Sequence, residues 1–168
     1  MAVFSAFKGK TPRVSEEAFV AETAVLIGDV AVGRDSSVWY GAVLRGDYAP
    51  ITVGEGTSIQ DNVTLHCEIG RPLRIGSNVT VGHNAVVHCA EIGDNTLIGM
   101  GALLLDGAVI GAHCIIAAGA VVKENEIVPD GTLMAGVPAK AVRTLPPERI
   151  AALEQPSGYI KLAKEYMK

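Results

Sequence analysis

The stretch IGDNTLIGMGALLLDGAVIGAHCIIAAGAVV, residues 92–122, decides the fold of this chain. An aliphatic residue recurs at every sixth position within it, namely at Ile92, Ile98, Leu104, Ile110, Ile116 and Val122. Glycine often follows the aliphatic residue, and Asp, Asn or Ala fill many of the remaining positions. A six-residue period matches neither a helix nor one continuous strand. It suits a short strand followed by a corner, where Gly, Asn or Asp adopts unusual backbone angles.

The same period extends towards the N-terminus. It continues through three further runs, which are Val20, Leu26, Val32, Val38, Leu44; then Val53, Ile59, Leu65; and then Ile75, Val81, Val87. Hexapeptide periodicity is typical of a parallel β-helix. We therefore expect an all-β fold, a parallel β-helix with three sides and coils of about 18 residues. Each aliphatic residue should point into this prism and stack on its equivalents in neighbouring coils.

Three segments follow from these patterns. We expect an extended N-terminal arm over residues 1–13, the hexapeptide-repeat β-helix over 14–138, and an exit turn with a C-terminal α-helical region over 139–168. Pro146 and Pro147 should open the helical region, and Pro156 should divide it into two short helices. Its apolar stripe must pack along a prism face or a neighbouring subunit.

Composition narrows the classes of function. Of the residues, 49% are hydrophobic but only 5% aromatic, as suits an interior of stacked Val, Ile, Leu and Ala. The net charge of −4 and the lack of a basic cluster argue against a nucleic-acid partner. No apolar run approaches the roughly 20 residues of a membrane span. An odd set of three cysteines, with no apolar secretory core in the first ten residues, predicts a cytoplasmic location.

Two histidines should lie one above the other on adjacent coils. His66 follows the interior residue Leu65, and His88 follows Val87, 22 positions later. If four extra residues bulge out near Gly70–Arg74, one full coil of 18 remains between them. Adjacent rungs of a parallel sheet lie about 4.7–4.9 Å apart. Two imidazoles at that spacing can share one metal ion, at about 2.0–2.1 Å per bond.

The same arithmetic extends this column in both directions. If three extra residues bulge out around Ala49–Thr52, Arg45 lies one rung before His66. Leu105 lies one rung beyond His88. Arg45 and Asp47 are either an ordinary surface ion pair or a support for the histidine column or an interface.

His83 falls on the preceding side of the prism, two residues after Val81. Bringing it to the same ion as His66 and His88 within one chain looks strained. We therefore expect a homotrimer with three interfacial metal sites, each with His66 and His88 from one chain and His83 from the next. For His113 we expect a structural role.

Two cysteines follow the stacked histidines. Cys67 and Cys89 have the same spacing as the two histidines, so they should also lie on adjacent rungs. They could be thiolate ligands of a metal or a redox pair. Because side chains alternate along a strand, we expect them to point inward as small core residues instead.

The chain closely resembles the γ-class carbonic anhydrase family of hexapeptide-repeat proteins. The matching stretches are Val38–Asp47, Ile59–His66, Val79–His88 and Ile92–Ala102. The resemblance implies a left-handed β-helix and a trimer that binds Zn²⁺, with Fe²⁺ or Co²⁺ as alternatives, through His66, His83 and His88. It implies that Gln60 hydrogen-bonds the metal-bound water, that Arg45 and Asp47 form a pair bridging subunits, and that Tyr159 overhangs the site.

The resemblance also implies an activity, which is the reversible hydration of CO2 to bicarbonate by a metal-bound hydroxide at subunit interfaces. Bound zinc lowers the pKa of its water to about 7, a value known from carbonic anhydrase itself. Two departures affect the export of the proton. Tyr48 stands where the best-studied form of the family has a glutamate. That form also has a long acidic loop with another glutamate after the first histidine, whereas the loop Cys67–Arg74 here is short and has Glu68 as its one acidic residue. We expect these departures to limit turnover rather than metal binding.

Two other functions remain open on this scaffold. One is an acyl-CoA thioesterase or acyltransferase, whose site would have to admit a pantetheine arm. The other is a non-catalytic protein that binds a metal or a siderophore. Fold alone does not decide among the three.

Overall fold

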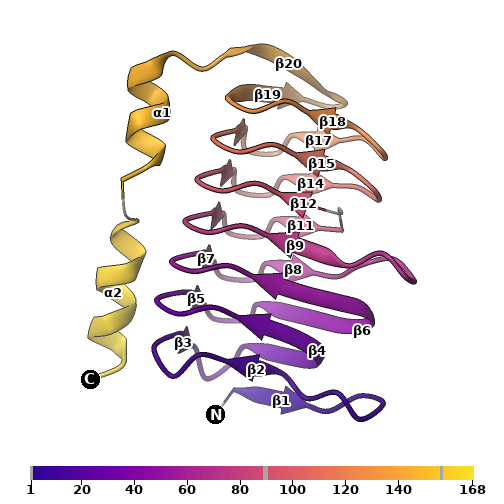
Figure 1. Cartoon of the computed structure of the whole chain (residues 1–168), viewed down its shortest axis with the longest axis vertical. Coiled ribbons are helices and arrows are strands. Elements are labelled where there is room, and N and C mark those ends of the chain that lie inside the picture. Colours follow the sequence, from indigo (N-terminus) through magenta and orange to yellow (C-terminus); the bar gives the residue numbers. More distant parts are fainter. Residues whose placement is uncertain (1, 89–90, 156) are drawn as a thin grey trace.

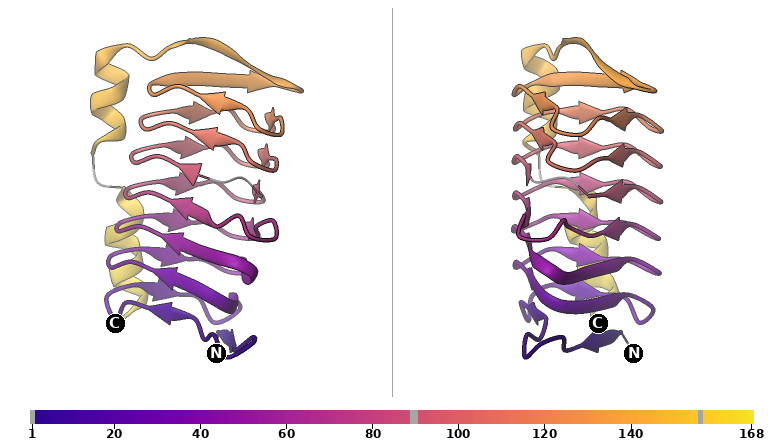
Figure 2. Two further views of the ribbon diagram at one scale, coloured as in Figure 1. Left: turned by 45° about the vertical axis from the view of Figure 1, so that its right-hand side comes forward. Right: turned by 90° about the vertical axis from the view of Figure 1, so that its right-hand side faces the viewer.

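The chain folds as the predicted left-handed parallel β-helix, with two helices along one side (Figure 1). The computed structural model describes residues 2–88, 91–155 and 157–168. Successive coils stack with the N-terminus at one end of the prism and the last coils at the other (Figures 1 and 2). All pairings between coils are parallel among the described strands that are listed below, except for one terminal hairpin.

The strands form three faces, which we name A, B and C. Face A holds β1 (Val3–Ser5), the first parts of β4 (Val25–Val32) and β6 (Val43–Val53), β8 (Thr64–Leu65), β11 (Val86–Val87), β14 (Leu103–Leu104) and β17 (Val121–Val122). Face B holds β2 (Arg13–Val14), the second parts of β4 and β6, β9 (Leu73–Ile75), β12 (Glu91–Ile92), β15 (Val109–Ile110) and β18 (Ile127–Val128). Face C holds β3 (Phe19–Val20), β5 (Ser37–Val38), β7 (Ser58–Ile59), β10 (Thr80–Val81), β13 (Leu97–Ile98), β16 (Ile115–Ile116), β19 (Thr132–Gly136) and β20 (Ala139–Thr144).

Aliphatic side chains stack inside the prism as the six-residue period predicts. On face A, the paired residues are Leu26, Leu44, Leu65, Val87, Leu104 and Val122, and all of them are fully buried. Each such burial contributes about 1.5–3 kcal/mol of hydrophobic stabilisation. The repeated register carries a sequence position on one coil directly to the equivalent position on the next.

Corners between the faces use residues that tolerate a positive φ. Asn62, Asn78, Asn84 and Asn95 all have φ between 55° and 60°, as expected for a residue that enters the left-handed region. Close approach of the coils imposes a second requirement at Gly82. A Cβ atom there would lie 2.7 Å from the backbone nitrogen of Met100, so this corner requires glycine.

The N-terminal segment joins the prism. Within the segment expected to be an arm, β1 pairs in parallel with β4 on face A, and β2 pairs with β4 on face B. At the other end, β19 pairs with β20 in an antiparallel hairpin. The sequence analysis expected a turn there and did not predict the strand β20.

Two helices run back along face C (Figures 1 and 2). They are α1 (Pro147–Leu153) and α2 (Gly158–Tyr166), in agreement with the two short helices expected. Pro156, the expected break, lies outside the described residues. Aromatic rings anchor α2, because Tyr159 and Tyr166 contact Trp39 with ring centroids 5.6 and 5.4 Å apart. No helix in the described part of the chain has the length and apolar character needed to cross a bilayer.

Candidate metal centre

His66 and His88 leave adjacent rungs of face A and lie side by side. The register Leu65↔Val87 places them there, and the backbone N–H of His66 donates to the carbonyl of Val87 over 3.1 Å. Nδ1 of His66 and Nε2 of His88 are 2.9 Å apart. The extra residues lie between β8 and β9, slightly earlier than the expected bulge near Gly70–Arg74, because Leu73 and Arg74 already pair with β6. The predicted stacking of the two histidines is therefore confirmed.

Arg45 and Asp47 flank the first histidine. The register Leu44↔Leu65 confirms that Arg45 lies on the rung before His66. The ladder shifts at Asp47–Pro50, slightly earlier than the expected bulge around Ala49–Thr52, because Ile51 and Thr52 already pair with β4. Nη1 of Arg45 donates to Asp47 over 2.6 Å, and the other carboxylate oxygen of Asp47 lies 3.0 Å from Nε2 of His66.

The charge of Asp47 follows from these contacts. Burial by itself would raise the pKa of this carboxyl group. Hydrogen bonds from Arg45 and His66 outweigh burial and lower the pKa below its usual value. Asp47 is therefore an anion at neutral pH, and an anion at Nε2 of His66 stabilises a proton on that nitrogen.

A carboxylate that the sequence analysis missed contacts the second histidine. Asp106, in the corner after β14, reaches Nδ1 of His88 through Oδ1. A signal for it was present, because Asp106 directly follows Leu105, which does lie one rung beyond His88 in the predicted column.

His83 belongs to a different part of the chain surface. It follows β10 on face C, where its backbone N–H donates to Oε1 of Gln60 over 3.1 Å. Its Nδ1 lies 2.9 Å from Oδ2 of Asp61, a second carboxylate that the sequence analysis missed. Among the described residues of one chain, no three His, Cys, Asp or Glu side chains converge on a metal position. One chain thus presents two separate candidate half-sites, which we name the His66–His88 pair and the His83–Gln60 pair.

Tyr159 is the second residue of α2, where its N–H donates to Oγ of Ser157 over 3.2 Å. Together with Gln60 and His83, Tyr159 lines a groove of about 450 Å³ across face C. Apolar side chains and backbone of β13 and β16 make up most of the remaining wall. Within one chain Tyr159 is associated with His83 rather than with the His66–His88 pair.

Tyr48 and Glu68, the two residues at the departures from the family pattern, make different contacts. The ring of Tyr48 packs on His66 with centroids 5.3 Å apart and is 55% exposed, so it is open to solvent. Glu68 forms an exposed ion pair with Arg71 at 3.4 Å.

Cys67 points inward, as expected. Its thiol donates to the carbonyl of Ala49 over 3.1 Å, and burial raises its pKa, which disfavours the thiolate that a metal ligand requires. Cys89 lies outside the described residues. His113 is remote from the other histidines in the chain's register and contacts Glu154 at 3.2 Å, in keeping with a structural role.

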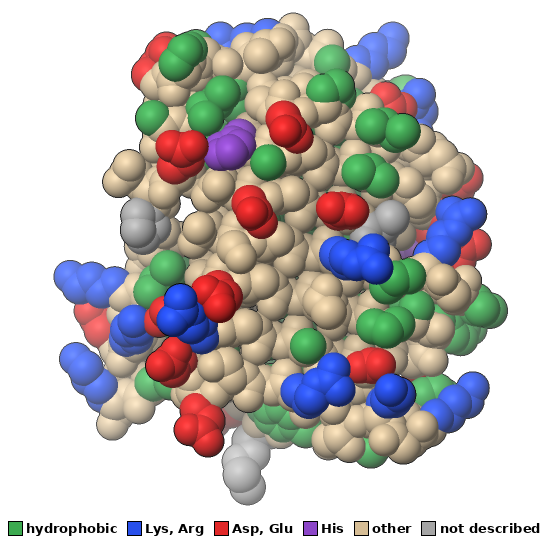
Figure 3. Space-filling model, viewed as in Figure 1, with side chains coloured by type: hydrophobic (Ala, Val, Ile, Leu, Met, Phe, Trp, Pro, Cys, Tyr) green, Lys and Arg blue, Asp and Glu red, His purple; other side chains and the backbone are tan. Residues whose placement is uncertain are grey.

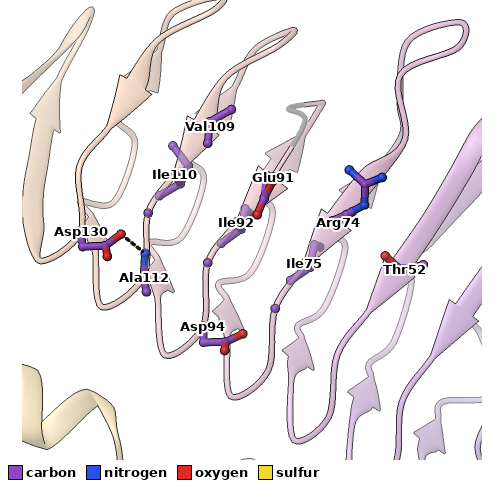
Figure 4. Close-up of a pocket in the computed structure, with 13 residues that line it drawn as sticks. Thr52, Arg74, Ile75, Glu91, Ile92, Asp94, Val109, Ile110, Ala112 and Asp130 are labelled. Carbon is purple, nitrogen blue, oxygen red and sulfur yellow. Dashed lines mark hydrogen bonds between the residues drawn. The ribbon is translucent and has the colours of Figure 1, made fainter.

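Another groove lies away from both histidine pairs. A groove of about 610 Å³ crosses face B and is lined by Arg74, Glu91, Asp94 and Asp130 among others (Figure 4). Asp94 and Asp130 accept hydrogen bonds from backbone N–H groups of neighbouring coils, so they brace corners. On the side shown in Figure 3, acidic and basic side chains are interspersed without a large patch of one sign.

Comparisons with known proteins agree with the hexapeptide-repeat fold. A family model for bacterial transferase hexapeptide repeats (six repeats) matches residues 89–124, and a model for the hexapeptide repeat of succinyl-transferase matches residues 72–104. Gamma carbonic anhydrase 1, mitochondrial, of Arabidopsis thaliana is 48% identical over 164 residues. That match covers 94% of this chain, which spans only 60% of the plant protein.

A bacterial relative and a crystal structure match over most of their length. Carbonic anhydrase of Geobacillus kaustophilus is 44% identical over 149 residues, covering 89% of this chain and 82% of the relative. A hexapeptide transferase family protein from Anaplasma phagocytophilum has a structure with a TM-score of 0.92. It is 42% identical to this chain and covers 98% of both chains.

Proposed function

This chain belongs to the γ-class carbonic anhydrase family of hexapeptide-repeat proteins, and from that membership we propose that it catalyses the reversible hydration of CO2 to bicarbonate at a metal centre between subunits. One observation carries the proposal most directly, which is the pairing of His66 with His88. Two ring nitrogens face each other there, and each ring has a carboxylate on its other nitrogen. A histidine that binds a metal almost always donates its other ring N–H to a carboxylate, a backbone carbonyl or water.

The spacing of the two histidines suits a metal ion. Two nitrogens bound at about 2.0–2.1 Å to one tetrahedral ion are about 3.3 Å apart. The observed 2.9 Å between Nδ1 of His66 and Nε2 of His88 is within a few tenths of an ångström of that value. Imidazole ligands suit Zn²⁺, which we propose as the metal, and they suit Fe²⁺ or Co²⁺ as alternatives.

The third ligand comes from another subunit in this proposal. His83 lies on face C, apart from the His66–His88 pair, so a metal centre with three histidines requires His83 of a second chain. Closed rotational symmetry would repeat such a contact in a homotrimer with three equivalent centres. When bound, the metal lowers the pKa of a water molecule so that hydroxide forms near neutral pH.

Side chains around the centre have separate tasks. Gln60 is 5% exposed, and its carbonyl oxygen accepts from the His83 N–H, so its amide N–H groups remain to donate to an oxygen of CO2 or bicarbonate. Asp47 orients His66, and Arg45, whose side chain is 42% exposed, holds Asp47 while leaving guanidinium donors for the neighbouring subunit. Tyr159 overhangs the groove and narrows the approach to His83 and Gln60.

The groove under Tyr159 favours a second candidate function. At about 450 Å³ and with a largely apolar wall, it falls within the size range of sites for much larger ligands than CO2. An acyl-CoA thioesterase or acyltransferase would place an acyl chain or pantetheine arm there. No feature of the described residues favours the third candidate, a siderophore-binding protein.

A cytoplasmic location remains a prediction. The buried thiols of Cys67 and Cys114 are free in the described chain, which suits a reducing compartment. The plant relative is named as mitochondrial, so subcellular fractionation of the source cells is the direct check.

Stopped-flow CO2 hydration tests the proposed function. The protein is prepared anaerobically, its metal content is measured, and the rate is compared with and without a chelator. We expect hydration that the chelator abolishes and added Zn²⁺ restores. Fully metal-loaded protein that hydrates no CO2 but cleaves an acyl-CoA thioester would replace the first function with the second.

A further inference from the structure

All three candidate ligand histidines contact a carboxylate, but each carboxylate comes from a different place in the fold. Asp47 contacts His66, Asp61 contacts His83, and Asp106 contacts His88. The repeat places Leu105, the neighbour of Asp106, one rung beyond His88, and the resemblance assigns Asp106 no role. It lies on the coil after His88, in the corner that leaves face A.

The backbone of the β-helix holds Asp106 in this corner. The register Val87↔Leu104 aligns the coil of Asp106 with that of His88. The carbonyl of Asp106 accepts from the N–H of Asn125 on the next coil over 2.8 Å, and Gly107 turns the chain with a φ of 68°. The position of the carboxylate is therefore set by coil stacking on both sides.

The contact determines which nitrogen of His88 is free. A carboxylate at Nδ1 stabilises a proton on that nitrogen, so the neutral ring has its lone pair on Nε2. Nε2 is the nitrogen that faces His66. With Asp106 removed, either nitrogen can carry the proton, and the ring loses the contact that orients it.

We propose that Asp106 is a positioning residue that holds His88 in the Nδ1–H form and so presents Nε2 to the metal. This inference rests on the proposed function for the identity of the metal centre. It goes beyond that function in assigning the orientation of one ligand to a residue outside the three-histidine motif. Partners of this kind typically change metal affinity by roughly 10–100-fold when they are removed.

The test compares three full-length variants with the wild type. Asp106→Ala removes the acceptor, Asp106→Asn keeps an acceptor oxygen but removes its charge, and Glu154→Gln removes the carboxylate from His113 as a matched control. Zn²⁺ and Co²⁺ affinities are measured by competition with a chromophoric chelator. We expect Asp106→Ala to bind roughly 10–100-fold more weakly, Asp106→Asn to be intermediate, and Glu154→Gln to match the wild type.

A second measurement does not depend on metal or activity. The chain has four histidines, so ¹⁵N-histidine labelling gives few ring signals, which can be assigned with single His variants. In metal-free protein at a pH where the rings are neutral, we expect His88 of the wild type in the Nδ1–H form. Asp106→Ala should shift its ring signals towards a mixture of tautomers.

Failure of this proposal is distinguishable from failure of the proposed function. Unchanged metal affinity and an unchanged His88 tautomer in Asp106→Ala would overturn the role of Asp106, even in an active carbonic anhydrase. A wild-type chain that binds no metal would overturn the proposed function, and the ring spectra would still decide whether Asp106 orients His88. Because the side chain of Asp106 is 42% exposed, we expect its removal to leave the thermal unfolding of the β-helix unchanged.

Discussion

The backbone N–H of His83 donates a hydrogen bond to Oε1 of Gln60 across adjacent coils, over 3.1 Å. This bond orients the side-chain amide of Gln60 next to His83. Because the amide oxygen accepts the bond, the amide nitrogen can donate to another group. The proposed ligand His83 and the proposed substrate-binding group Gln60 therefore lie side by side on face C, while the His66–His88 pair lies on face A. The separation of His83 and Gln60 from the His66–His88 pair can be tested by substitution.

Removal of a ligand should abolish metal binding and activity together. In His88→Ala the pair loses one of its two facing nitrogens, so we expect metal content and chelator-sensitive CO2 hydration to fall to background. His113→Ala is the matched control and should keep both. Metal analysis by mass spectrometry and stopped-flow assays make the comparison. Wild-type hydration in His88→Ala would contradict the assignment of the site.

Removal of Gln60 should separate metal binding from rate. We expect Gln60→Ala to retain its metal and to lose roughly 100-fold in kcat, the typical effect of deleting one preorganised hydrogen-bond donor. Gln155→Ala, which alters an exposed amide outside both half-sites, is the control. An unchanged kcat in Gln60→Ala would remove the amide from the proposed mechanism.

Mixed trimers should regain activity that neither parent has. A chain with His83→Ala keeps its His66–His88 pair, and a chain with His88→Ala keeps His83. If the two chains are co-expressed in equal amounts and assemble at random, about one quarter of the interfaces unite intact halves. We expect about a quarter of wild-type metal content and hydration in the mixture. Centres formed within single chains would give none, and light scattering reports the trimer independently.

Proton export should respond to an acidic residue at position 48. Tyr48 packs on His66 and is exposed, so a carboxylate there would lie near the centre and in contact with solvent. We expect Tyr48→Glu to raise kcat at low buffer concentration by roughly 10-fold and to weaken its dependence on buffer. Glu68→Gln, which alters a residue already paired with Arg71, should change neither. Equal buffer dependence in Tyr48→Glu and the wild type would show that position 48 does not limit turnover.

The lowered pKa of Asp47 predicts that the folding stability of the protein decreases at acidic pH. A carboxyl group whose pKa is lower in the folded state contributes stability above its unfolded pKa, near 3.9, and loses that contribution as pH falls through the folded value. Wild-type protein should therefore lose stability more steeply than Asp47→Asn below about pH 4. Thermal unfolding followed by circular dichroism between pH 7 and pH 3 measures the difference. Parallel curves for the two proteins would contradict the assignment.

Counting residues in coils of about 18 predicted the positions of side chains correctly wherever one coil stacks directly on the next. The column from Arg45 through His66 and His88 to Leu105 was predictable, because parallel pairing repeats each position at a fixed spacing. It failed where the period ends. The strand β20 pairs antiparallel with β19, and nothing in a six-residue repeat signals such a hairpin.

The sequence by itself determined the β-helix, the inward stack of aliphatic residues and the adjacency of His66 and His88, because a regular period converts residue number into position. Only the tertiary structure decided that Asp61 and Asp106 face the histidines and that Tyr159 lines a groove with His83 rather than with the His66–His88 pair. These contacts depend on how corners project their side chains and on how the aromatic cluster of α2 packs against Trp39. Such packing joins residues that share no period, so spacing along the chain does not encode it.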